Sequence, residues 1–87
     1  MNIKESFVNF IVSVDPSKKN PKKRKEIKKA YAMMQNGVTL AKFSISLWND
    51  FNMIVNAWGH HFKKDEFSMT PDEAFVLFYE RKFLTQA

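Results

Sequence analysis

The sequence predicts an all-α fold, a small single-domain four-helix bundle. A chain of 87 residues is long enough for one modest hydrophobic core. Apolar residues make up 45% of it and thirteen residues are aromatic, which is typical of a chain that folds. Four segments repeat apolar residues at three- and four-residue steps, the period of an amphipathic helix. We expect one domain over 1–87 without a separate linker, with helices near residues 2–14, 21–36, 40–58 and 71–85.

The first helix is predicted from its capping signal and its apolar spacing. Asn2 precedes Glu5 by three residues, which is the spacing of a capping box with Asn in place of Ser or Thr. The dipeptide Asp15-Pro16 should end the helix, because the residue before proline avoids helical backbone angles. The apolar positions of this segment are Ile3, Phe7, Phe10, Ile11 and Val14.

The second helix should begin at Pro21, since proline suits the first helical position, and end at Asn36-Gly37. Its expected buried stripe is Ile27, Ala30, Tyr31 and Met34. That stripe would leave Lys22, Lys25 and Lys29 together on the opposite, solvated face.

The third helix, from 40 to 58, should be capped by Thr39 and closed by Gly59. Residues 42–48 also alternate as in a strand, but one consistent helical face over the whole segment favours a helix. We expect this helix to be the centre of the core, with its large aromatic side chains largely buried: Trp48, Phe51 and Trp58.

The last helix has the strongest start signal, with Thr70 as N-cap, Pro71 at the first position and Glu73 completing a capping box. Its apolar residues spread around nearly the whole circumference. Either the helix is unusually enclosed, or part of it is a partner interface. The aromatic candidates for that interface are Phe75, Phe78, Tyr79 and Phe83.

Basic residues are concentrated between Lys18 and Lys29. Eight basic residues and one acid, Glu26, give this segment a net charge of +7, whereas the six basic and eight acidic residues of the rest give −2. Cations near a helix N-terminus oppose the helix dipole, so the arrangement lowers helix stability and favours a functional interpretation. The candidate residues for binding nucleic acid or an acidic partner are Lys18, Lys19, Lys22, Lys23, Arg24, Lys25, Lys28 and Lys29.

Two functions fit these features. The first is a small basic, non-enzymatic accessory or regulatory protein that binds the phosphates of DNA or RNA through the lysine cluster. Lysine and asparagine, which have A/T-rich codons, are abundant, so we expect a phage or mobile-element protein in the cytoplasm of a bacterial cell or phage-infected host. In outline the chain resembles bacteriocin immunity proteins and small phage regulators, although no residue motif carries a site across.

The second function is a protein-directed inhibitor, immunity factor or assembly adaptor. It would dock through the aromatic C-terminal helix and the basic helix, and could block a nucleic-acid enzyme or form a homodimer. Other interpretations are weaker. A helix-turn-helix would use Thr39, Lys42, Ser46 and Asn49 as base readers, yet the cations lie on the preceding helix. Phe62 and Phe67 would either stack on single-stranded bases or cover one end of the bundle.

The sequence offers no catalytic chemistry, and we expect no enzyme activity, cofactor or metal. Cysteine is absent, and the two glycines, Gly37 and Gly59, cannot form a glycine-rich phosphate loop. His60-His61, with Asp65 and Glu66 nearby, lacks the strict spacing of a metal site. No apolar run has the length of a membrane span.

Overall fold

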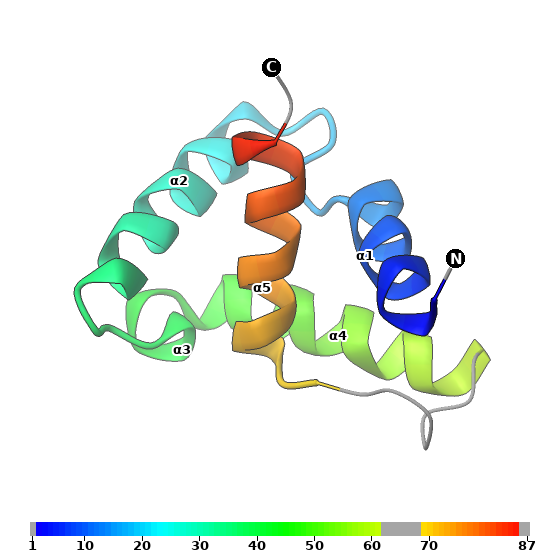
Figure 1. The fold of residues 1–87 in the computed structure, drawn as a ribbon. Helices are drawn as coiled ribbons and strands as arrows, with labels where there is room; N and C mark the ends of the chain where they lie inside the picture. The colour runs from blue at the N-terminus through cyan, green and yellow to red at the C-terminus, as the bar shows by residue number, and fades with distance from the viewer. Residues whose placement is uncertain (1, 62–68, 86–87) are drawn as a thin grey trace.

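A computed structural model describes residues 2–61 and 69–85, and it confirms the all-α fold (Figure 1). No strand occurs within those two ranges. The helices are α1 (Ile3–Val14), α2 (Pro21–Gln35), α3 (Leu40–Phe43), α4 (Ile45–His61) and α5 (Pro71–Tyr79), and α5 continues into a π-helical turn, η2 (Glu80–Leu84).

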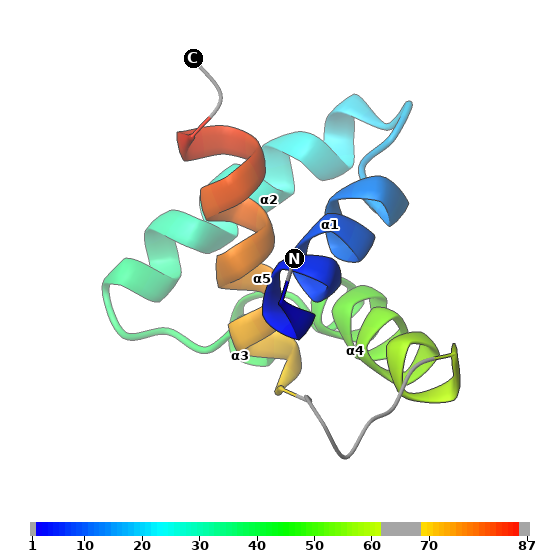
Figure 2. The same cartoon turned by 45° about the vertical axis from the view of Figure 1, so that its right-hand side comes forward.

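Helix α5 runs through the middle of the molecule, with α1 on one side, α2 on the other and α4 crossing its N-terminal end (Figures 1 and 2). Phe51 of α4 packs against Phe75 and Phe78 of α5, with ring centroids 5.2 and 5.3 Å apart. Trp58, near the end of α4, meets Phe7 of α1 edge-on at 4.9 Å. The core is therefore centred on two helices, α4 and α5, rather than on the third predicted helix alone.

Local capping explains most of the helix starts. The side chains of Asn2, Asn20, Thr39 and Thr70 each accept a hydrogen bond from the backbone N–H three residues on. At Thr70 the side chain of Glu73 also accepts a hydrogen bond from the N-cap backbone N–H, which makes a complete capping box there.

Helix α2 ends in a Schellman motif. The N–H of Val38 donates to the carbonyl of Met33 at 3.1 Å, and the N–H of Gly37 donates to that of Met34 at 3.0 Å. Gly37 adopts φ +89°, which is accessible to glycine and strained for side-chain-bearing residues, so the predicted stop at Asn36-Gly37 is confirmed.

The prediction of one helix over 40–58 is wrong, because the chain breaks at Ser44 (φ −154°, ψ 107°). The Ser44 hydroxyl accepts a hydrogen bond from the N–H of Leu47 at 3.2 Å and donates to Glu26 Oε2 of α2 at 2.8 Å. A serine that caps a new helix in this way competes with continuation of the old one. The break leaves Ile45 62% exposed, and α4 then runs past Gly59 to His61.

The predicted helix over 71–85 is α-helical only to Tyr79. In η2 the N–H of Thr85 donates to the carbonyl of Glu80 at 3.0 Å, five residues back, which widens the turn. Two side chains of η2 hold it to the N-terminal part of the chain: Arg81 donates to Asn9 Oδ1 at 3.1 Å, and Lys82 pairs with Asp15.

Asp15, only 1% exposed, joins the end of α1 to η2. Its Oδ1 accepts hydrogen bonds from the backbone N–H and the hydroxyl of Ser17, and its Oδ2 lies 2.5 Å from Lys82 Nζ. Burial by itself would raise the pKa of this carboxyl, but the contacts with Lys82 and Ser17 outweigh burial and hold the pKa below its ordinary value.

We expect Asp15 to make the fold acid-sensitive. Because its folded-state pKa is lowered, its contribution is complete above the ordinary value of 3.8 and is lost as pH falls through the folded-state value. Urea unfolding of wild type and Asp15→Asn should show a smaller loss of stability on acidification in the variant. Lys82→Met, which leaves the buried carboxylate unpaired, should cost about 2 kcal/mol near neutral pH. Parallel stability-against-pH curves for wild type and Asp15→Asn would contradict this role.

Phe51 should be a centre of stability, because its ring is fully buried between α4 and α5. Phe51→Ala should lower the free energy of unfolding by about 3–5 kcal/mol, a large part of the total for a chain of this size. Met53→Ala on the same helix is the control, since Met53 is 69% exposed and should change stability by less than about 0.5 kcal/mol. Equal losses of stability for the two variants in urea unfolding would contradict the burial of the Phe51 face of α4.

Candidate nucleic-acid interface

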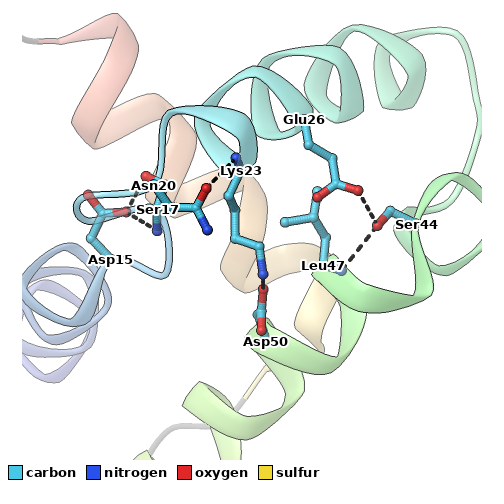
Figure 3. Close-up of polar contacts among 8 residues, drawn as sticks. All are labelled: Asp15, Ser17, Asn20, Lys23, Glu26, Ser44, Leu47 and Asp50. Atoms are coloured by element: carbon cyan, nitrogen blue, oxygen red, sulfur yellow. Dashed lines mark hydrogen bonds and ion pairs between the residues drawn. The ribbon is translucent and has the colours of Figure 1, made fainter.

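Two polar contacts fix how α2 is rotated against the rest of the protein (Figure 3). Lys23 Nζ lies 2.6 Å from Asp50 Oδ2 of α4, and Glu26 accepts a hydrogen bond from Ser44. Lys23 and Glu26 are three residues apart, so both lie on the flank of α2 that faces α3 and α4. Ile27 and Ala30 are fully buried and supply the apolar part of the same docking.

With α2 held in this way, its outer face carries Lys22, Lys25 and Lys29. All three side chains are exposed, and none forms an ion pair or hydrogen bond with a residue in 2–61 or 69–85. The single acid of the basic segment, Glu26, is turned toward Ser44. The outer face therefore carries three lysines that have no ion-pair partner among the described residues.

The other members of the predicted cluster are placed differently. Lys23 is half-buried and paired with Asp50, so its charge is largely compensated within the molecule. Lys18 is exposed and donates to the carbonyl of Ser13 at 2.6 Å. Lys19 is exposed in the loop before α2, with φ +58°. The loop thus brings two further cations to the N-terminal end of the same helix.

The outer face of α2 forms one wall of an open groove of about 970 Å³. Its lining combines five lysines and one acid, Glu26, with apolar surface from Ala32 of α2 and Phe43 of α3. A groove whose lining is mainly cationic and partly apolar suits an anionic polymer or an acidic protein segment.

Arg24 and Lys28 lie on the flank of α2 that faces the C-terminal segment. Arg24 Cζ and Lys28 Nζ stand 6.0 and 5.8 Å from the centroid of the Phe83 ring, within the range of cation–π contacts. One turn further along α2, Tyr31 stacks on Tyr79 with centroids 4.0 Å apart and planes 6° apart. Two basic side chains and one aromatic side chain of α2 thus contact aromatic rings of the C-terminal segment along this flank.

The predicted aromatic interface needs correction. Phe75 and Phe78 are fully buried in the core between α4 and α5, so they cannot contact a partner in this fold. Tyr79 and Phe83 are partly buried and reach the surface beside α2. The helix is apolar all round because α1, α2 and α4 enclose it.

The expectation for the three large core aromatics holds for two of them. Phe51 and Trp58 are buried, whereas Trp48 is only partly so. Of the helix-turn-helix candidates, Thr39 caps α3, and Lys42, Ser46 and Asn49 are exposed, but the break at Ser44 divides the predicted reader helix. Phe62, Phe67, Asp65 and Glu66 lie outside the described residues.

Within residues 2–61 and 69–85, no three histidine or acidic side chains lie close enough together to hold a metal ion. No helix in these ranges has the length and apolar character needed to cross a membrane.

Sequence reasoning missed the Lys23–Asp50 pair and the contacts of Arg24 and Lys28 with Phe83. The sequence does contain a signal for the first pair. Asp50 is the one acid within α4, and the next acid along the chain is Asp65, so Asp50 is the one carboxylate that α4 offers to a lysine of α2. The second set depends on the π-helical turn, for which the sequence has no recognisable signal.

Comparison with protein-family models, with curated proteins and with solved structures gives no match to this chain.

Proposed function

We propose that this protein binds the phosphates of nucleic acid electrostatically, through the outer face of α2, as a small accessory or regulatory protein that performs no chemistry. The observation that carries the proposal is the uncompensated row of Lys22, Lys25 and Lys29, beside which Lys23 and Glu26 are turned inward. Lysine binds phosphate as a point charge, and such contacts carry little sequence information.

The dimensions of the row suit a nucleic-acid strand. Lys22 and Lys29 are seven residues apart, which is about 10 Å along a helix, and one DNA strand presents about three phosphates over that axial length. Lys18, Lys19, Arg24 and Lys28 flank the row and can extend the contact to roughly four to six phosphates. The lysine- and asparagine-rich composition favours a phage or mobile-element setting within a bacterial cytoplasm.

The affinity for DNA should depend steeply on salt. For four to six neutralised phosphates, log K for a random duplex should fall with log salt at a slope of about −4 to −5. Fluorescence anisotropy of one labelled duplex titrated at several salt concentrations measures this slope. Binding that is independent of salt, or absent at low salt, contradicts the proposal.

Reversing two charges on the outer face should weaken binding to all sequences alike. Lys25→Glu with Lys29→Glu should lower affinity at least about tenfold at about 0.1 M salt, because two phosphate contacts are replaced by repulsion. The melting temperature should hardly change, since both side chains are exposed and unpaired within the described ranges.

The matched control is Lys4→Glu with Lys42→Glu, which changes the net charge equally at two exposed positions outside the basic segment. It should lower affinity much less than the α2 variant. An equal loss would mean that only net charge matters, and a larger loss would favour a surface on α1 or α3 instead.

A second candidate is a protein-directed inhibitor or adaptor whose partner presents an acidic surface. The groove favours it, because Phe43 adds apolar area beside the lysines and Ile45, two residues further on, is highly exposed. If the protein does not bind a random duplex or single strand at low salt but does bind an acidic partner, the second function replaces the first.

A homodimer through Tyr79 and Phe83 is tested by sedimentation at micromolar concentration.

A further inference from the structure

Three aromatic rings form a ladder beside the basic helix. Tyr31 of α2 stacks on Tyr79 of α5, and Tyr79 stacks on Phe83 of η2 with centroids 4.8 Å apart and planes 26° apart. All three side chains are partly exposed, and Leu84, next to the ladder in sequence, is 58% exposed. The ladder therefore lies at the edge of the core, packed against it and partly open to solvent.

The π-helical turn brings Phe83 to this position. A π-turn is less favourable than a continued α-helix and recurs at functional sites. Here it is held by Lys82, which pairs with Asp15, and by Arg81, which donates to Asn9. The ring of Phe83 consequently lies next to Arg24 and Lys28, two members of the basic cluster.

We propose that the protein prefers single-stranded nucleic acid to duplex, with one unstacked base on the Phe83 ring and the adjoining phosphates on Arg24 and Lys28. This inference rests on the proposed function and names the form of nucleic acid that the same helix takes. A cation–π contact near solvent is weak, so Arg24 and Lys28 can exchange it for a phosphate. Once Arg24 and Lys28 have moved off the Phe83 ring, a base of the same strand stacks on it.

The arrangement favours a single strand for two reasons. Bases in a duplex are stacked on both faces and offer no free face to Phe83, whereas unpaired bases stack readily on aromatic side chains. The row of Lys22, Lys25 and Lys29 also belongs to one helix and suits one backbone, which can continue from the outer face to the flank with Arg24 and Lys28. An acidic peptide would use the cations but would gain nothing from the ring.

The test compares one DNA strand of about 15 nucleotides, without self-complementarity, with the duplex made from it. Anisotropy titrations at about 0.1 M salt should show tighter binding of the single strand by wild type. Phe83→Leu keeps an apolar side chain against Tyr79 and Phe78 but removes the π-face. It should weaken single-strand binding about tenfold and leave duplex binding unchanged, and Phe83→Trp should retain the preference.

Two controls separate this inference from the proposed function. Leu84→Ala changes an exposed neighbour without a ring and should alter neither affinity. Lys25→Glu with Lys29→Glu should lower both affinities. Suppose that Lys25→Glu with Lys29→Glu lowers both affinities, while Phe83→Leu changes neither the single-strand nor the duplex affinity, or changes both equally. The single-strand preference is then overturned, and phosphate binding stands. If wild type binds neither form at low salt, both are overturned.

Crosslinking keeps the proposal testable if Phe83→Leu fails to fold, as circular dichroism would show. Ultraviolet irradiation of wild type with the same strand carrying bromodeoxyuridine should place the adduct in the peptide that contains Tyr79 and Phe83. An adduct confined to other peptides overturns the inference. Tighter binding of poly-glutamate than of the single strand, at equal salt, also overturns it.

Discussion

The rotation of α2 about its own axis is the constraint on which the whole candidate interface depends. Burial of Ile27 supplies roughly 1.5–3 kcal/mol and holds the helix against the core. The partly exposed Lys23–Asp50 pair contributes at most about 1 kcal/mol, so it adds little to stability. Its importance is directional: burial of Ile27 and Ala30 sets which side of α2 faces the core, and the pair, together with the Glu26–Ser44 bond, turns Lys23 and Glu26 toward α3 and α4.

The same constraint links the basic helix to the C-terminal segment. Once Ile27 faces the core and Lys23 faces α4, Arg24 and Lys28 necessarily face α5 and η2. The C-terminal segment is in turn fixed to the end of α1 by Asp15 and Lys82. The surface that we propose for nucleic-acid binding is therefore assembled from two distant parts of the sequence, and it exists only in the folded chain.

Features of the fold that depend on local signals could be predicted from the sequence. Asn2, Thr70 and Gly37 act through residues a few positions away, and the helix ends that they define are confirmed. The break at Ser44 could not be predicted, because its hydroxyl is held by Glu26, eighteen positions earlier. The enclosure of Phe75 and Phe78 likewise depends on three surrounding helices. For the candidate site, the sequence shows that the lysines are clustered, but it does not show that Lys23 is paired with an acid of another helix.

The position of the basic residues within α2 follows from this assembly. Cations in the first turns of a helix are unfavourable, each by up to about 1 kcal/mol, and the last turn of α2, where they would be favourable, holds none. A row of lysines near the C-terminal end would carry the same charge and stabilise the helix. It would lie away from the Phe83 ring, whose cation–π contacts are with Arg24 and Lys28. Under the proposed function, the proximity of Arg24 and Lys28 to the aromatic ladder gives a physical reason for an arrangement that helix stability alone disfavours.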